Sequence, residues 1–323
     1  MSHIENPLVT IIIPVYNGSN YLAQAIDSAL AQTYRNVEVF VINDGSKDNG
    51  ATEAVAKSYG DKIRYIYKPN GGVSSALNLG IKEMKGSFAS WLSHDDLYLP
   101  DKIKHQMSFI TNLSREKNLN IEDCVVYSPI MVVNSEGKFI TKSHSLFRTI
   151  QDPTYVFSNL IGFNLCGCAS LIPKNIFEKI GVFDEKLLTV QDVDFWYRIL
   201  LTGHSYYYDN THLVKNRRHK GQTSHVMKDE WIKEIDSFQS SLIKKIQTNE
   251  SLSKTNVFLG LAKFLYIKGV PTTMPLIKKT LKDNTSNLEY IFSICPRLLY
   301  WKFCRFCRNI LKTIYNTFIL GLR

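Results

Sequence analysis

The sequence predicts an α/β protein built on a mainly parallel β-sheet with helices on both faces. Through the first 92 residues, short apolar runs alternate with segments whose apolar residues recur every three or four positions. The runs are rich in Val and Ile, which is typical of strands buried on both faces. Each intervening segment is long enough for a helical crossover, so consecutive runs are expected to form right-handed βαβ units.

The individual elements of this region follow from the same pattern. Strands are predicted over residues 9–14, 37–42, 63–67 and 88–92, where the apolar runs are continuous. Helices are predicted between them, over residues 20–32, 49–59 and 73–85.

After Asp101 the pattern is less regular and predicts an extension of the sheet with both strand directions. The predicted elements are a helix over 103–113, a strand over 124–127, two strands flanking the turn 134–137, and helices over 174–180 and 192–201. From about Val226 onward the pattern is helical. We therefore predict two domains, a sheet domain over residues 1–225 and a helical extension over residues 226–323.

The composition is that of an ordinary soluble protein, with 44% apolar residues among 323. The first seven residues lack the features of a secretory signal, and no run approaches the ~18 apolar residues of a membrane-spanning helix. We therefore expect a cytoplasmic protein. The net charge of +10 permits phosphate binding, but no nucleic-acid-binding signature accompanies it, so nucleic acid is not an expected partner.

The six cysteines are scattered along the chain and are expected to be free thiols. Cys304 and Cys307 lack the second pair that a zinc site requires. Cys166 and Cys168 are interpreted as small packing residues.

The last segment of the chain is basic and aromatic, with no acidic residue after Glu289. Two interpretations stay open. The segment lies in the interface of the cell membrane on its inner face, where anionic lipid attracts cations, or it packs on its own protein with a solvated cationic face. We favour the membrane interface.

Two adjacent carboxylates, Asp95 and Asp96, follow the predicted strand 88–92. Open α/β sheets bind ligands at the carboxyl ends of their strands, and Mg²⁺ prefers carboxylate and phosphate oxygens. The pair therefore indicates a site for a metal and a diphosphate. The alternative is that one of the two acids caps the next helix, because Asp is a preferred N-cap and Pro100 lies just beyond.

The first two predicted strands also end in residues suited to a site. Asp44 and Gly45 follow the second strand, and the turn from Pro14 to Gly18 follows the first. Parallel strands bring these ends to one edge of the sheet. No Gly-rich dinucleotide or P-loop motif is present at these junctions, which argues against a dehydrogenase or a P-loop ATPase.

Seven sequence blocks together resemble the family-2 glycosyltransferases of the GT-A fold, in particular those that build bacterial surface polysaccharides. The resemblance covers roughly the first 225 residues, and both the order and the spacing of the blocks match. The blocks are residues 9–17, 41–48, 70–74, 92–96, 181–185, 191–196 and 218–224.

The resemblance implies a site for a nucleotide-sugar donor, with a UDP-sugar expected. The residues assigned to it are Pro14, Tyr16, Asp44, Asn70, Gly72, His94 and Asp95. Asp44 is expected beside the base. Asp95 corresponds to the last acid of the family's Asp-x-Asp motif and is expected to bind Mg²⁺ or Mn²⁺.

The resemblance also implies a second metal ligand and a catalytic base. His219 stands where related enzymes carry a His near the diphosphate; the alternative is a loop histidine packed against Arg218. Asp192 matches the Asp of the family's Glu-Asp motif and is expected to be the base. The alternative for Asp192 is that it only starts the predicted helix, where acidic residues are favoured.

Three positions depart from the family pattern. Ser93 replaces the first acid of Asp-x-Asp, Leu77 stands where an Arg commonly precedes Asn78, and Gln191 replaces the Glu before the base. A single carboxylate, the diphosphate and water still suffice for Mg²⁺. Lys68 is a candidate to replace the phosphate contact of the missing Arg.

The function implied is that of an inverting, metal-dependent glycosyltransferase that moves one sugar to a saccharide or lipid-linked acceptor. A single base suffices, whereas a glycosidase needs two carboxyl groups. The processive Gln-x-x-Arg-Trp motif is absent, and the expected pathway is the assembly of capsule, lipopolysaccharide or exopolysaccharide. The alternatives are a non-catalytic nucleotide-sugar-binding or assembly subunit, and a sugar nucleotidyltransferase.

Overall fold

The computed structural model describes residues 6–143, 165–202, 204–227 and 229–235, together with 237, 238 and 241. The described residues up to Phe238 belong to one compact unit. Within them, no helix combines the length and the apolar character needed to cross a bilayer. The basic segment after Glu289 and Cys304 and Cys307 lie outside the described residues, and the domain boundary at 225/226 stays a prediction.

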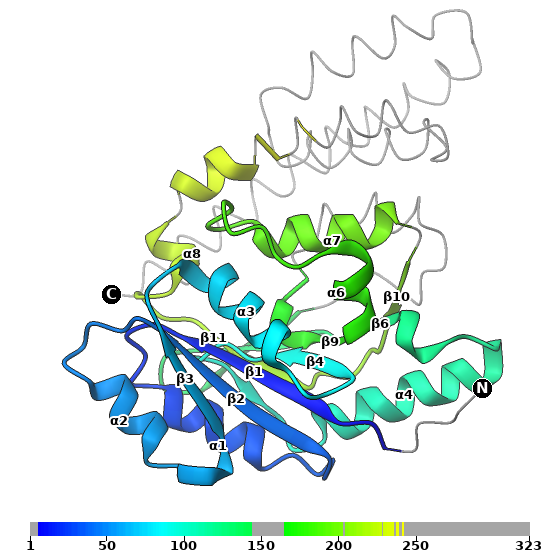
Figure 1. Ribbon diagram of the computed structural model, residues 1–323, viewed down its shortest axis with the longest axis horizontal. Helices are drawn as coiled ribbons and strands as arrows, with labels where there is room; N and C mark the ends of the chain where they lie inside the picture. Colours follow the sequence, from blue (N-terminus) through cyan, green and yellow to red (C-terminus); the bar gives the residue numbers. More distant parts are fainter. Residues whose placement is uncertain are drawn as a thin grey trace, which may run out of the picture. The chain divides into compact units, whose positions relative to one another are not determined.

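A seven-stranded sheet forms the centre of this unit, with the strand order β10-β6-β9-β4-β1-β2-β3 (Figure 1). Only β9 runs antiparallel to its neighbours, so the predicted mainly parallel sheet is confirmed. The strands are β1 (Val9–Val15), β2 (Val37–Asp44), β3 (Arg64–Lys68), β4 (Phe88–Trp91), β6 (Cys124–Tyr127), β9 (Ser170–Pro173) and β10 (Ser205–Tyr208).

Helices cover both faces of this sheet (Figure 1). One face carries α1 (Leu22–Leu30), α2 (Ala51–Lys57) and α4 (Lys102–Lys117), and the other carries α3 (Gly72–Glu83), α6 (Lys174–Ile180) and α7 (Gln191–Leu201). The elements predicted before residue 92 agree with the structure to within two residues at each end. Single 3₁₀ turns occur at Gly60–Lys62, Ile121–Asp123 and Gly167–Ala169.

The alternation of side chains along β1 explains why the strand is apolar throughout. Ile11 and Ile13 belong to the same buried cluster as Leu22 and Ile26 of α1. Ile12 points to the opposite face, where it meets α3. Because both faces are buried, every position of this strand favours an apolar residue.

Gly80 allows α3 to lie close against the sheet. A Cβ atom at this position would lie 2.6 Å from Cγ2 of Ile12 and 2.9 Å from Cδ1 of Ile42. Both neighbours are buried core side chains, so neither has free space to move into. This close approach brings the N-terminal end of α3 to the carboxyl ends of β1 and β2.

A second, four-stranded sheet has the order β5-β11-β7-β8. Its strands are β5 (Leu97–Tyr98), β7 (Ile130–Val133), β8 (Phe139–Lys142) and β11 (Val214–Arg217). β7 and β8 form the predicted hairpin. β11 pairs with both β5 and β7, and it carries the chain back to the end of β4.

Replacing Gly80 by Ala should lower the free energy of unfolding, although Ala is the better helix former. Overpacking a core costs about 1–3 kcal/mol, against a gain in helix propensity of about 1 kcal/mol. Urea unfolding measures the difference. Lys82→Ala, an exposed change in the same helix, is the control. A higher unfolding midpoint for Gly80→Ala would contradict the close approach of α3.

Candidate active site

The carboxyl ends of four parallel strands, β1 to β4, meet at one edge of the large sheet (Figure 1). Asp44, the last residue of β2, is the register partner of Lys68 in β3. Beyond β4 the chain stays beside β1, because the N–H of Leu92 donates to the carbonyl of Ile12 at 2.9 Å. The structure therefore places Asp44 and the segment 93–96 at the same edge.

The buried carboxylate of Asp44 organises the loop that follows β3. Lys68 Nζ and the N–H of Gly71 donate to its Oδ1 at 2.6 and 3.0 Å. The N–H of Gly72 and Nδ2 of Asn70 donate to its Oδ2 at 2.8 and 3.2 Å. Three residues assigned to the nucleotide site, Asp44, Asn70 and Gly72, are thus in direct contact. Lys68 forms an ion pair with Asp44.

Gly45 is required where this loop passes the end of β2. Its backbone has a positive φ of 71°, and a Cβ atom there would lie 2.5 Å from the backbone nitrogen of Asn70. A side chain at this position would therefore push the loop away from Asp44.

The turn after β1 lies beside the end of β2. The N–H of Asn17 donates to Oγ of Ser46 at 2.9 Å, and Oδ1 of Asn17 accepts the N–H of Lys47 at 2.7 Å. Tyr16 is 43% exposed at this edge, so its ring is available to a ligand. Pro14 lies within β1 as the register partner of Ile42.

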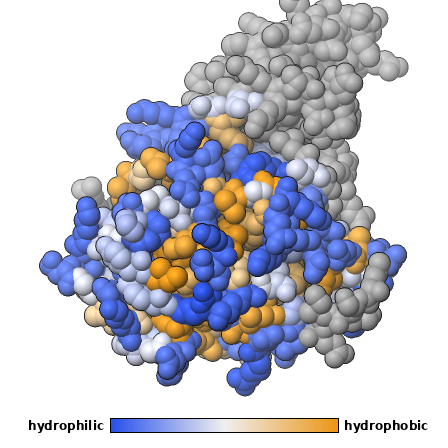
Figure 2. Space-filling model, in the orientation of Figure 1, coloured by the Kyte–Doolittle hydropathy of each residue, from blue (hydrophilic) through white to orange (hydrophobic). Residues whose placement is uncertain are grey.

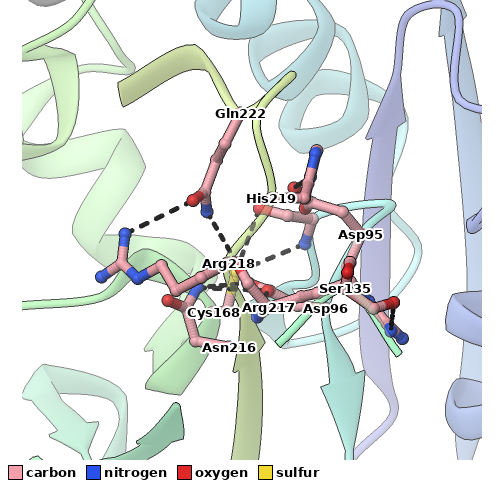
Figure 3. Close-up of polar contacts among 10 residues, drawn as sticks. Asp95, Asp96, Ser135, Cys168, Asn216, Arg217, Arg218, His219 and Gln222 are labelled. Carbon is pink, nitrogen blue, oxygen red and sulfur yellow. Dashed lines mark hydrogen bonds and ion pairs between the residues drawn. The ribbon is translucent and has the colours of Figure 1, made fainter. Parts of the chain in front are cut away.

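Asp95 and His219 come together from distant parts of the chain (Figure 3). Oδ2 of Asp95 lies 2.9 Å from Nε2 of His219, and the centre of the His219 ring lies 5.2 Å from that of Tyr21. The alternative in which His219 packs against Arg218 is not what the structure shows, because the Arg218 guanidinium donates to Gln222.

The helix-capping alternative for the acidic pair is wrong. The N-cap of α4 is Asp101, beyond β5, and α4 itself begins at Lys102. Asp95 and Asp96 instead bind residues of the segment 216–219.

His94 packs against the turn after β1. A Cβ atom at Gly18 would lie 2.4 Å from Cδ2 of the His94 ring, so this close approach requires a glycine. Burial lowers the pKa of His94, which keeps the imidazole neutral at pH 7. The contact joins the turn after β1 to the end of β4.

Asp96 has a structural role beneath Asp95. Its carboxylate accepts Nδ2 of Asn216 at 3.1 and 3.0 Å and the N–H of Arg217 at 2.8 Å (Figure 3). Burial, with the neighbouring Asp95 carboxylate as a second cause, raises the pKa of Asp96 above its ordinary value. The side chain joins the end of β4 to β11.

Arg217, the last residue of β11, holds the backbone of Asp95 in place (Figure 3). Its Nε donates to the carbonyl of Asp95 at 2.9 Å, Nη1 to the carbonyl of Ser135 at 2.8 Å, and Nη2 to Oε1 of Gln24 at 2.8 Å. The guanidinium also lies over the ring of Tyr21, 4.5 Å from its centre. One fully buried side chain thus connects β4, α1 and the β7–β8 hairpin.

The described cysteines, Cys124, Cys166 and Cys168, are free thiols, as predicted. Cys168 Sγ lies 3.2 Å from Oγ of Ser93, the residue that replaces the first acid of Asp-x-Asp. Asp96, Cys166 and Cys168 have possible ligand atoms within 4.8 Å of one another. Thiols suit soft metals rather than Mg²⁺ or Mn²⁺, and the Asp96 carboxylate already binds Asn216 and Arg217.

Asp192 is the second residue of α7 and lies half-buried in its first turn. Its Oδ1 accepts the N–H of Val193 at 2.8 Å, and among the described residues no basic side chain forms an ion pair with it. Burial raises the pKa of Asp192 from 3.8 to about 6. The preceding side chain, Gln191, has a buried Oε1 with no hydrogen-bond partner.

Aromatic packing fixes α7 in place. Phe195 stacks on Phe177 of α6 with ring centres 5.2 Å apart. The ring centre of Phe183 lies 4.7 Å from that of Phe195. The next residue, Trp196, packs edge-on against Tyr206 of β10. Asp194 pairs with Arg198 one turn later. Aromatic packing therefore holds the part of α7 that begins at Phe195.

A groove of about 610 Å³ lies between α3 and α6 and begins at Lys68, the ion-pair partner of Asp44. On the face that carries these helices, apolar side chains are exposed in patches among polar ones (Figure 2). None of the residues assigned to the nucleotide-sugar site lines this groove. Asn78, which follows the departure at Leu77, is among its lining residues.

An open α/β sheet with carboxylates at its strand ends is typical of enzymes that bind nucleotides. The particular class follows from comparison with known proteins. The chain belongs to glycosyl transferase family 2, whose model matches residues 10–181. It is therefore a glycosyltransferase of the α/β GT-A type, as the sequence blocks indicated.

Several known proteins are similar to the chain in sequence. An uncharacterised glycosyltransferase of Rickettsia typhi is 43% identical over 289 residues, which is 85% of this chain and 86% of the relative. One of Rickettsia bellii is 46% identical over 76% of this chain, but the match spans only 35% of that relative. Chondroitin synthase of Pasteurella multocida is 37% identical over 45% of this chain and 14% of its own length.

Solved structures show the same fold. S. aureus TarS 1-349 in complex with UDP-GlcNAc has a TM-score of 0.60 at 17% identity, covering 85% of this chain and 80% of that chain. A longer TarS structure also has a TM-score of 0.60, covering 80% of this chain and 43% of its own. At this level of identity the likeness establishes the fold alone.

Replacing Arg217 by Lys should lower the free energy of unfolding by about 2–4 kcal/mol, because one ammonium group cannot reach three separate acceptors. Arg218→Lys is the matched control: its guanidinium is exposed, so the cost should stay within about 0.5 kcal/mol. Urea unfolding of both variants measures the difference. Equal midpoints would contradict the role of Arg217 as a connection between the two sheets.

Proposed function

We propose that the chain is an inverting, metal-dependent glycosyltransferase that moves one sugar from a nucleoside-diphosphate sugar to a saccharide or lipid-linked acceptor. The observation that carries the proposal is the contact between Asp95 and His219, at the same sheet edge as Asp44. Surface polysaccharide assembly is the proposed setting, in line with the chondroitin synthase relative.

The nucleotide is proposed to lie at the ends of β1 and β2. There Tyr16 offers an exposed aromatic ring, and Asp44 holds the loop with Asn70 and Gly72. His94 fills the space between the turn after β1 and Asp95. The solved TarS complexes with UDP and with UDP-GlcNAc support a UDP-sugar as the donor.

The residues around Asp95 fit a divalent cation. A carboxylate oxygen and an imidazole nitrogen converge from two segments, and Oδ1 of Asp95 has no hydrogen-bond partner among the described residues. Carboxylate oxygen is a preferred ligand of both Mg²⁺ and Mn²⁺, and imidazole is a ligand of transition metals rather than of Mg²⁺. Asp95 and His219 would hold the ion, and a bound cation would neutralise charge on the leaving diphosphate.

Asp192 is proposed to be the base. Its carboxylate takes the proton of the acceptor hydroxyl as that oxygen forms a bond to the anomeric carbon, and the bond from this carbon to the diphosphate oxygen breaks on the opposite face. The configuration at the anomeric carbon is thereby inverted. A raised pKa suits this role because it strengthens the base while leaving it ionised at neutral pH.

Family membership argues against the nucleotidyltransferase alternative. A non-catalytic subunit is distinguished by experiment. The proposal also includes a saccharide or lipid-linked acceptor and attachment to the inner face of the membrane through the basic segment after Glu289. That segment lies outside the described residues.

Asp192→Asn should slow the release of UDP from a UDP-sugar with Mn²⁺ by about 100-fold or more, because general base catalysis contributes factors of that size. Coupled detection of UDP measures the rate. Asp61→Asn, an exposed acid in a surface turn, is the control and should match the wild type. A wild-type chain that binds UDP but releases none from any sugar nucleotide would favour the non-catalytic alternative.

The rate should also fall as the pH drops below about 6, since protonated Asp192 cannot accept a proton. The same shift affects stability with a defined sign. The folded pKa exceeds the unfolded value of 3.8, so the stability linked to this group is complete below pH 3.8 and is lost as the pH rises through about 6. Asp192→Asn should therefore unfold at no lower urea concentration than the wild type at pH 7. A marked loss of stability would indicate a structural carboxylate.

UDP with Mn²⁺ should raise the melting temperature of the wild-type chain, and EDTA should abolish most of this increase. A ligand at 100-fold its Kd adds about 2.7 kcal/mol of stability. Asp95→Asn should respond weakly to UDP whether or not Mn²⁺ is present, because it lacks the proposed ligand. An undiminished Mn²⁺-dependent increase in this variant would place the metal elsewhere.

A further inference from the structure

The carboxylate of Glu234 binds the turn that leads into α7. Its Oε1 accepts the N–H of Leu188 at 2.8 Å, and its Oε2 accepts the N–H and the hydroxyl of Thr189 at 2.8 and 2.6 Å. Donors from two consecutive residues therefore converge on one side chain.

This carboxylate is held as an anion next to a helix N-terminus. Burial opposes its ionisation, but hydrogen bonds from Thr189 and Leu188 outweigh burial and keep the pKa of Glu234 below its ordinary value. α7 begins at Gln191, two residues after Thr189. Negative charge at this end of a helix interacts favourably with the helix dipole.

The opposite end of the turn is held by α3. Nδ2 of Asn78 donates to the carbonyl of Phe183 at 2.9 Å, and Oδ1 of Asn78 accepts the N–H of the same residue at 2.9 Å. Oγ of Ser74 donates to the carbonyl of Leu187 at 3.4 Å. The contacts of α3 thus reach as far as Leu187, and the last residues before α7 contact Glu234.

Asp192 depends on this backbone for its position. Among the described residues, its carboxylate receives a hydrogen bond only from the backbone N–H of Val193. Its place is therefore set by the first turn of α7 and by the residues directly before it.

We propose that Glu234 is a positioning residue for sugar transfer, which sets the place of the Asp192 carboxylate by anchoring Leu188 and Thr189, just before α7. The inference rests on the proposed function, in which Asp192 is the base. A base has to lie within hydrogen-bond reach of the hydroxyl that it deprotonates, and a misplacement of about 1 Å costs roughly 100-fold in rate. Glu234 lies beyond residues 10–181, the part of the chain that matches the family model.

Glu234→Gln tests the proposal, because it keeps the size of the side chain but sets an NH₂ group against backbone N–H donors. Release of UDP from the UDP-sugar that the wild type turns over fastest should slow by at least about 10-fold. The melting-temperature increase given by UDP and Mn²⁺ should be unchanged, since the donor residues are untouched. Glu230→Gln, an exposed change in the same segment, is the matched control and should behave as the wild type.

A double variant separates positioning from general damage. If Glu234 acts through Asp192, adding Glu234→Gln to Asp192→Asn should lower the residual rate no further. An equal fold-loss in both backgrounds, or a wild-type rate in the single variant, would overturn the proposal.

Amide hydrogen exchange gives a readout that needs no activity. In Glu234→Gln, peptides covering residues 184–192 should exchange faster than in the wild type, while peptides from β1 and β2 keep their protection. Unchanged exchange at 184–192 would overturn the proposal even for a chain that turns over no donor. If the wild-type chain turns over no donor, faster exchange at 184–192 in Glu234→Gln would still support the anchoring role of Glu234. The absence of turnover would then count against the proposed function alone.

Discussion

The contact between the Asp95 carboxylate and the His219 imidazole joins two parts of the chain that are 124 residues apart. It depends on buried polar residues beneath it. Asp96 binds Asn216 and the backbone of Arg217, and the Arg217 guanidinium binds the backbone of Asp95. Breaking one of these buried contacts leaves donors or acceptors without partners, which is costly inside a protein. The two sheets are thus held in one relation at the point where the proposed donor site lies.

The acidic residues of the proposed site differ in their surroundings more than in their chemistry. Asp44 is saturated with donors and shapes a loop, whereas Asp95 has an oxygen available beside an imidazole. Asp96 is buried among structural partners, and Asp192 stands at a helix start with only backbone donors. Burial and hydrogen bonding divide four similar side chains between positioning, metal binding and proton transfer.

The sequence predicted the first half of the fold well because its signals are local. Alternation of apolar strands and amphipathic helices defined every β-strand and α-helix before residue 92 to within two residues. β5, β9, β10 and β11 were not predicted. Each has four residues or fewer, too few for a periodic pattern, and each pairs with strands distant in sequence. β4 and β6 are equally short, and they were predicted only because their residues form apolar runs.

Residues of the candidate site that belong to sequence motifs were also predicted, whereas those defined by contacts distant in sequence were not. Motif resemblance located Asp44, Asp95, Asp192 and His219 as candidates. It did not separate buried Arg217 from its exposed neighbour Arg218, because two adjacent arginines carry no local sign of which one enters the core. Glu234 also has no local signal, since its importance comes from the amides of Leu188 and Thr189, which are 45 residues or more away in sequence. The capping alternative for Asp95 and Asp96 was wrong because a distant segment, residues 216–219 at the end of β11 and just beyond it, supplies their partners.

The proposed site requires that Asp95 and His219 hold a divalent cation together with the donor diphosphate. A crystal grown with UDP and Mn²⁺ tests it most directly, through the anomalous signal of the metal. We expect a single strong anomalous peak in contact with the Asp95 carboxylate and the UDP phosphates, with His219 beside it. A peak at Asp96, Cys166 and Cys168 instead, or UDP bound with no metal at Asp95, would contradict it.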